Sequence, residues 1–222
     1  MKQLIIIGDS IMKGVTFNGQ KYQLCQEHSF DFLSQRSVAV QNFSKMGATV
    51  TTGLSILKRK LAAQPNADGT TVLFSFGGND CDYDWAKISA NPDGAFLPNT
   101  PQDTYIDVYR DAIRTAQDAG AHVAVTSLLP IDAERYMNHI ASGHSYDNIL
   151  HWLGDIGHLY RWQEYYSGLS CTLARAFGCQ LIDLRSEFLK VKNFRTLLGA
   201  DGIHPTQAGH DIIHHCISTA LA

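Results

Sequence analysis

The sequence predicts an α/β fold, a three-layer α/β/α sandwich built on a five-stranded parallel sheet. Two patterns point to this class. Short apolar runs recur along the 222 residues, and longer stretches with helical spacing separate them. Strands that alternate with helices pair in parallel through right-handed crossovers, which place helices on both faces of the sheet. The chain is long enough for one large core, so we expect residues 1–222 to form a single domain.

The predicted strands are short and apolar, and turn residues flank each of them. This pattern is typical of strands that are buried on both faces of a sheet. In chain order, the runs are residues 3–8 (QLIIIG), 38–40 (VAV, leading to Asn42), 71–76 (TVLFSF), 122–127 (HVAVTS) and 179–183 (CQLID).

Helical spacing fills most of the sequence between these runs. The clearest case is Gln102–Ala119, where Ile106, Tyr109 and Ile113 lie on one stripe and Gly120 follows as a C-cap. The predicted helices cover roughly residues 21–35, 52–63, 102–119, 156–177 and 206–221.

Two stretches interrupt the alternation, near residues 81–101 and 128–155, and we expect both to be irregular. Long loops at the functional edge of an α/β sheet often carry specificity. Aromatic residues gather in and near them, and these either pack the loops or form an acyl-lining or sugar-stacking wall. They are Tyr83, Trp85, Tyr136, Trp152, Tyr160 and Trp162.

Polar motifs follow the first three predicted strands directly. Gly8-Asp9-Ser10 follows the first strand, residues 42–47 follow the second, and Gly77-Gly78-Asn79-Asp80 follows the third. In open parallel sheets, ligands bind beyond the carboxyl ends of the strands, where the strand order reverses. We therefore expect a functional site at this edge.

Ser10 is the candidate nucleophile of that site. A serine hydroxyl reacts poorly unless a base removes its proton. The segment Asp201-Gly202-Ile203-His204 offers His204 as the base and Asp201 as the carboxylate that orients its ring. Taken alone, Ser10 would also fit a helix cap and Asp201 a surface cap.

Acyl transfer also needs donors for the oxyanion that develops on the substrate. Gly47 lets a backbone N–H approach the substrate without a side chain in the way. Asn79 offers a neutral side-chain amide, and the N–H of Ser10 is a third donor. We expect these three groups to form an oxyanion hole.

At these residues the chain resembles the SGNH, or GDSL-type, hydrolase family, which is named for four sequence blocks. Ser10, Gly47, Asn79 and His204 match the blocks in order, and Asp201 matches the family aspartate. The blocks extend over residues 8–205, nearly the whole chain. Ile11 departs from the leucine of many members. The resemblance implies a flavodoxin-like sheet, no metal or cofactor, and hydrolysis of esters from acetylated sugars to lysophospholipids.

We expect a carboxylic-ester hydrolase that works through an acyl-serine intermediate. The polar and aromatic loops favour short acyl groups or acetyl groups, including those of carbohydrates. A lysophospholipase or thioesterase with the same residues is the alternative, and apolar lining in the two irregular stretches would favour it. A binding module that kept the fold and lost activity is a third interpretation.

The charge and the length of the apolar runs give no support for a nucleic-acid-binding or a membrane-inserted protein. The net charge of −3 and the lack of a basic run give no reason to expect a nucleic-acid partner. The apolar run at residues 4–7 is too short to span a membrane, so we expect a cytoplasmic protein without stable membrane insertion. The sequence leaves the oligomeric state open.

Cysteine and histidine patterns point away from disulfides and metals. The five cysteines are scattered without a C-x-x-C pair, which favours reduced thiols, and nothing near Cys81 indicates an activated thiolate. The histidines at positions 139, 144, 151 and 158 fit no common zinc spacing.

Overall fold

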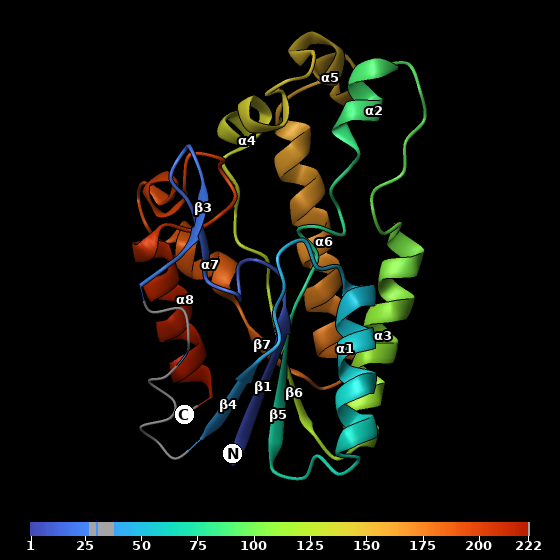
Figure 1. Ribbon diagram of the computed structural model, residues 1–222, viewed down its shortest axis with the longest axis vertical. Coiled ribbons are helices and arrows are strands. Elements are labelled where there is room, and N and C mark those ends of the chain that lie inside the picture. Colours follow the sequence, from blue (N-terminus) through green and yellow to red (C-terminus); the bar gives the residue numbers. More distant parts are fainter. Residues whose placement is uncertain (27–29, 31–37, 222) are drawn as a thin grey trace.

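The computed structural model describes residues 1–26, 30 and 38–221, and its centre is a parallel sheet (Figure 1). Within these residues the sheet has five strands in the order β4-β1-β5-β6-β7. Numbered along the chain, this is the flavodoxin-like order 2-1-3-4-5. The five predicted strands are confirmed to within a few residues: β1 Gln3–Gly8, β4 Ala39–Asn42, β5 Thr70–Ser75, β6 His122–Thr126 and β7 Gln180–Ile182.

Helices cover both faces of this sheet, which confirms the three layers (Figure 1). Strand side chains point alternately to opposite faces. Ile5 and Ile7 accordingly pack in the apolar cluster of one face, and Leu4 and Ile6 pack in that of the other. The first face carries α1 Val50–Ala63, α3 Gln102–Asp118 and α6 Gly157–Ala176, and the second carries α7 Leu184–Leu189 and α8 Gln207–Ala220.

Strand β4 departs from the expected burial. It lies at an edge of the sheet and pairs with β1 alone in the described structure, and most of its residues are exposed. Burial on both faces is therefore wrong for β4, although it holds for β5, whose residues Thr70–Ser75 are all buried. The burial of the two strands differs because β4 lies at the edge of the sheet. An edge strand has a neighbouring strand on one side only, and fewer side chains pack over it.

A hairpin replaces the start of the first predicted helix. Strands β2 Val15–Phe17 and β3 Tyr22–Leu24 pair antiparallel, so the helix expected over residues 21–35 is wrong at its beginning. Residues 27–29 and 31–37 of that prediction lie outside the described residues. The turn between the strands is local: the Asn18 side chain accepts the N–H groups of Gln20 and Lys21, and Gly19 has a φ of 93°.

The two stretches expected to be irregular contain three short helices. They are α2 Trp85–Ala90, α4 Ala133–Ile140 and α5 Tyr146–Leu153. With the N-terminal end of α6 they form what we call the helical cap, at the end of the sheet opposite both termini (Figure 1). The cap has its own apolar cluster, which includes Ile88, Met137, Ile140 and Ile149.

Local capping explains why the cap is helical. Asp84, Asp132 and Ser145 each precede one of these helices, and each side chain accepts a hydrogen bond from a backbone N–H in the first turn. The same signal precedes α7, where Asp183 accepts from the N–H of Ser186. In the described part of the chain, every helix is too short or too polar to cross a membrane.

Candidate active site

Ser10 lies in the turn that follows β1 and is buried. Its Oγ is 2.9 Å from Nε2 of His204. The Asp9 carboxylate closes the turn by accepting the N–H of Ile11 at 2.9 Å. The chain continues from this turn into β2, so Ser10 does not cap a helix. The structure instead directs its hydroxyl at an imidazole.

Asp201 completes a chain of hydrogen bonds through His204. Its Oδ2 lies 2.6 Å from Nδ1 of His204, and its Oδ1 accepts the backbone N–H groups of Ile203 and His204. The Asp201 side chain is fully buried, so the surface-cap alternative is wrong. Burial acts to raise the pKa of the Asp201 carboxyl, but the His204 ring and the backbone N–H groups together hold that pKa below its usual value.

Gly202 allows this loop to pack closely against the helical cap. Its φ is 75°, a conformation that favours glycine, and an added Cβ would lie 2.5 Å from the backbone oxygen of Asp132. The N–H of Asp132 donates to the Gly202 carbonyl at 2.8 Å. The glycine between Asp201 and His204 therefore brings the start of α4 against the loop that carries both residues.

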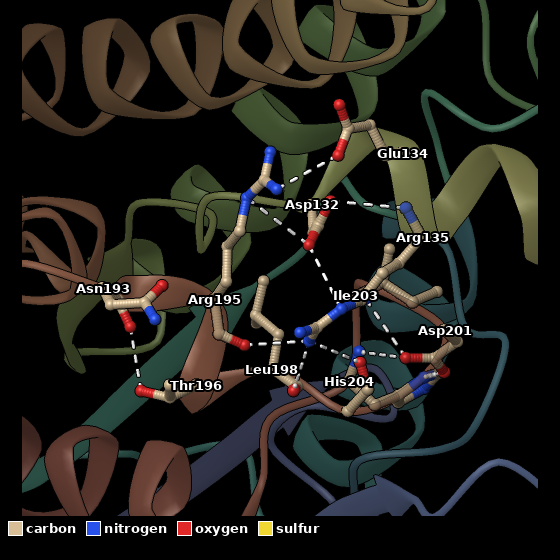
Figure 2. Close-up of polar contacts among 11 residues, drawn as sticks. Asp132, Glu134, Arg135, Asn193, Arg195, Thr196, Leu198, Asp201, Ile203 and His204 are labelled. Atoms are coloured by element: carbon tan, nitrogen blue, oxygen red, sulfur yellow. Dashed lines mark hydrogen bonds and ion pairs between the residues drawn. The ribbon is translucent and has the colours of Figure 1, made fainter.

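A charged network fixes the same loop from the cap side, as Figure 2 shows. Arg135 on α4 donates to the carbonyl oxygens of Arg195, Leu198 and Gly199 at 2.9, 3.1 and 3.4 Å. The buried Asp132 carboxylate lies 3.2 Å from Nε of Arg135 and 3.6 Å from Nε of Arg195. The sequence interpretation missed this network, since the residues at the start of α4 and those near Arg195 are about 60 positions apart, and only the capping role of Asp132 could be detected locally.

The expected oxyanion donors are brought together only in part. Asn79 lines the same cavity as Ser10, and its side-chain N–H₂ donates to the Ala48 carbonyl at 3.1 Å, which leaves one N–H for a ligand. Gly47 lies in the exposed turn before α1 with a φ of 72°, outside the residues that line the cavity.

Asp9 and Asp80 anchor the loops around these donors through backbone N–H groups. The Asp80 carboxylate accepts the N–H of Val50 at 3.0 Å, which ties the third block to the start of α1. Burial raises the pKa of both carboxyls to about 6. Cys81 lines the cavity, and burial raises the pKa of its thiol, so the thiol stays protonated at neutral pH.

A cavity of about 110 Å³ extends from Ser10 and His204 to the helical cap. Its walls are mostly apolar and aromatic, and among the described residues that line it none is lysine or arginine. The apolar members are Ile11, Leu128, Leu129, Ile131, Leu153, Leu159, Leu184 and Ile203, and the aromatic members are Tyr83, Trp85, Tyr136, His158, Trp162 and His204.

The amino-acid sequence matches the model of one protein family over most of its length. The model of the GDSL-like Lipase/Acylhydrolase family matches residues 6–212, nearly the whole chain. The chain belongs to this family. It is therefore an enzyme, a serine ester hydrolase, and its substrates are small-molecule esters. No curated protein sequence matches this GDSL-like hydrolase.

Solved structures support the fold of the GDSL-like hydrolase. A lipase/acylhydrolase from Enterococcus faecalis is 19% identical with a TM-score of 0.67, covering 100% of this chain and 95% of that one. A catalytic mutant of an acetylxylan esterase from Geobacillus stearothermophilus is 17% identical with a TM-score of 0.69, covering 100% and 94%. A G-D-S-L family member from Veillonella parvula is 14% identical with a TM-score of 0.66, covering 98% and 96%.

The β2–β3 hairpin of the GDSL-like hydrolase packs against the ring of His204. The rings of Tyr22 and His204 meet edge to face with centroids 5.1 Å apart, and the Tyr22 hydroxyl is 3.2 Å from Nε2 of His139 on α4. The hairpin thus links the His204 ring to the cap. The sequence interpretation missed Tyr22 because it placed this residue in a helix.

The histidines of the cap separate into different environments. His139 bonds Tyr22, His151 lies 2.9 Å from Asp93, and His158 lines the cavity with its ring stacked near Trp162. Among the described residues, no three His, Cys, Asp or Glu side chains of the GDSL-like hydrolase are placed to hold a metal ion together.

Proposed function

We propose that the chain hydrolyses carboxylic esters through an acyl-serine intermediate, with Ser10 as nucleophile, His204 as base and Asp201 as the group that orients the base. One observation carries this assignment. Asp201 accepts from Nδ1 of His204 at 2.6 Å, and Nε2 of His204 lies 2.9 Å from the Ser10 hydroxyl, so the three residues form a continuous chain that ends at a cavity.

The mechanism follows from these contacts. His204 Nε2 takes the proton of the Ser10 hydroxyl as Oγ attacks the ester carbonyl. The Asp201 carboxylate holds the proton on Nδ1, so Nε2 is the nitrogen free to accept. The protonated ring then gives its proton to the departing alkoxide, and water, deprotonated by the same nitrogen, releases the acid and restores Ser10.

The oxyanion of each tetrahedral intermediate needs fixed donors. We assign this role to the remaining side-chain N–H of Asn79 and to the backbone N–H of Ser10, since both residues line the cavity. The N–H of Gly47, which lies outside that lining, stays a prediction from the sequence. The Ala48 carbonyl supports the Asn79 assignment, because it fixes the orientation of the amide by accepting its other N–H. Such donors each contribute about 3 kcal/mol or more to transition-state stabilisation.

A short apolar acyl group is the substrate feature that the cavity supports best. Leu128, Leu129 and Ile131 follow β6 and line the cavity beside Ser10. A cavity of roughly 150 Å³ holds one benzene ring. The volume here is about 110 Å³, which suits an acyl group of a few carbons. Apolar lining of this kind favours a short alkyl chain over the acetyl group of a sugar.

A lysophospholipase or thioesterase activity is the second candidate, and one observation favours it. Leu153 and Leu159 line the far end of the cavity and also belong to the apolar cluster of the helical cap. A longer chain would extend toward that cluster if the cap helices moved apart. The absence of lysine and arginine from the described lining argues against a phosphate group inside the cavity.

Hydrolysis of p-nitrophenyl esters tests both candidates. We expect activity that is highest for acyl chains of about two to six carbons and at least about 10⁴-fold lower in Ser10→Ala. Ser55→Ala is the matched control, because Ser55 is exposed on α1 and donates only to the Thr51 carbonyl of its own helix.

Three outcomes discriminate among the alternatives. Equal activity of the wild type and Ser10→Ala would remove Ser10 from the mechanism. Rates that rise steadily beyond octanoyl would favour the lysophospholipase or thioesterase. Absence of activity toward every ester, together with normal folding, would favour a catalytically silent binding module.

A further inference from the structure

A carboxylate lies in the cavity, and the proposed mechanism does not use it. Asp82 comes three residues after Asn79 and lines the same cavity as Ser10. The Tyr136 hydroxyl donates to Oδ1 of Asp82 at 2.6 Å, and Nε1 of Trp85 donates to the same oxygen at 2.8 Å. Two donors on one oxygen leave the second oxygen, Oδ2, with capacity to accept.

Burial raises the pKa of the Asp82 carboxyl, and its hydrogen-bond donors and the nearby His139 offset that rise only in part. These donors are a phenol, an indole and the backbone N–H of Tyr83, all of them neutral. Within the described ranges, no lysine or arginine forms an ion pair with Asp82, and the cavity contains a second carboxylate, Asp9. A half-buried carboxylate without a cationic partner is costly unless a ligand supplies the charge.

Aromatic rings line the cavity around this carboxylate. Tyr83 and Trp85 meet at an interplanar angle of 63°, and Trp85 and Tyr136 meet at 85°. Trp162 adds a further ring to the same cavity; its centroid is 6.1 Å from that of Tyr83 and its plane is inclined by only 29°. The four rings therefore present faces in several directions, whereas a sugar ring stacks best on one flat face. Ring faces attract compact cations, most strongly where water is excluded.

We propose that the aromatic box, formed by Tyr83, Trp85, Tyr136 and Trp162 around Asp82, binds an alkylammonium group of the substrate. This inference rests on the proposed function for the statement that the bound molecule is an ester. The Cα atoms of Asn79 and Asp82 are at most about 10 Å apart, and both residues line one cavity, so a single small ester could reach both. The substrate class is therefore a short ester whose alcohol or acyl part carries a positive charge.

A matched pair of small molecules tests the box directly. Choline carries the cation, and 3,3-dimethylbutan-1-ol has the same shape with a neutral carbon in place of nitrogen. All three tryptophans lie in or beside the box: Trp85 and Trp162 line the cavity, and the centroid of Trp152 is 4.9 Å from that of Tyr83. Tryptophan fluorescence during a titration therefore reports binding at this place without any turnover.

For the wild type, we expect a dissociation constant about tenfold lower for choline than for the neutral alcohol. Asp82→Asn keeps an oxygen for Tyr136 and Trp85 but removes the charge, and we expect it to lose most of this preference. Asp84→Asn is the matched control. Asp84 lies on the same segment but outside the cavity and pairs with Lys87, so its loss should leave the preference unchanged.

Several results would overturn the proposal. Equal binding of the two molecules by the wild type, no detectable choline binding, or an unchanged preference in Asp82→Asn would each do so. Binding of methyl xyloside in place of choline would assign the box to a carbohydrate. If Asp82→Asn fails to fold, Tyr83→Leu removes one wall and should weaken choline binding about threefold. Failure of these titrations would leave ester hydrolysis at Ser10 untouched, because the two are measured separately.

Discussion

Ser10 and His204 are 194 residues apart in sequence, and their side chains meet at 2.9 Å. Ser10 follows the first strand of the sheet, whereas His204 precedes the last helix, so the contact exists only in the folded chain. Asp201 differs, since it is three residues from His204 and its carboxylate accepts backbone N–H groups of the same loop. The contact between Asp201 and His204 is thus determined by the conformation of one short loop, whereas the contact between His204 and Ser10 depends on the whole fold.

Residues next to strand ends could be predicted, and residues that act through tertiary contacts could not. Ser10 and Asn79 follow apolar strands directly, which marks them in the sequence. Tyr22, Asp82 and Arg135 have no such marker, because each acquires its role from a partner on another element: His204, Tyr136 and the carbonyl groups near Leu198.

A buried histidine outside the proposed Asp201–His204–Ser10 chain gives a prediction for the pH dependence of stability. His210 on α8 is 1% exposed, and its Nε2 is 3.1 Å from the Val15 carbonyl on β2. Burial lowers the pKa of His210 from 6.5 to about 4. Between these values the unfolded chain binds a proton that the folded chain does not. His210 therefore stabilises the fold fully above pH 6.5, and this contribution, on the order of 3 kcal/mol, is lost as the pH falls to 4.

His210→Gln keeps a donor for Val15 and removes the titration. Urea unfolding of both proteins between pH 4 and 7 measures the effect. We expect the stability difference, wild type minus variant, to fall by about 3 kcal/mol from pH 7 to pH 4. The raised pKa values of Asp9 and Asp80 act in the opposite direction, but they are common to both proteins and cancel. Parallel curves would show that His210 does not titrate in this range.

At the scale of elements, the main sheet and its long helices were predictable and the small additions were not. Strands β1 and β5 each contain a central run of buried apolar residues, and α3 carries a continuous buried stripe, so the sequence pattern identified them. The β2–β3 hairpin has only three residues in each strand, and α2, α4 and α5 have six to eight residues each. Elements this short are stabilised mainly by caps and tertiary packing, and hydrophobic periodicity detects them poorly.

The contact between α4 and the Asp201–His204 loop gives an element-scale prediction. Arg135→Met removes the donor to three loop carbonyls and one partner of the buried Asp132. We expect unfolding to become easier by about 2 kcal/mol. We also expect kcat for p-nitrophenyl butyrate to fall about tenfold with little change in KM, because the loop loosens around His204.

Two further variants separate positioning from general destabilisation. Arg135→Lys keeps the charge, but it lacks the planar guanidinium that contacts the loop carbonyls through Nη1 and Asp132 through Nε, so it should restore kcat only partly. Arg110→Met removes an exposed arginine that pairs with Asp107 on α3 and should change neither stability nor kcat measurably. Wild-type kcat in Arg135→Met would show that the α4 contact does not position the catalytic loop.

At the scale of the whole molecule, the site lies where the flavodoxin-like strand order reverses. Strands β1 and β5 are neighbours in the sheet, and Ser10 and Asn79 follow them into the same cavity. Residues of the helical cap line the far end of that cavity. Helix α6 extends from the cap along the sheet (Figure 1). The strand order explains why the sequence could place the site. It does not determine the cap, which adds Trp85, Tyr136, Leu153, His158 and Leu159 to the cavity wall.

The sheet edge and the helical cap contribute different parts of the site. The sheet edge and the Asp201–His204 loop provide the proposed chemistry, and the cap provides the walls around Asp82 and the far end of the cavity. Changes in the cap should therefore alter which ester is accepted, whereas changes at the sheet edge should alter the rate for every ester.

Labelling with a fluorophosphonate probe followed by peptide mapping tests the central claim most directly. The probe reacts with a serine hydroxyl only when a base activates it. We expect one adduct, on Ser10, in the wild type, a much slower reaction in His204→Ala, and no adduct in Ser10→Ala. An adduct on another serine, or equal labelling of the wild type and His204→Ala, would contradict the assignment of Ser10 as a nucleophile activated by His204.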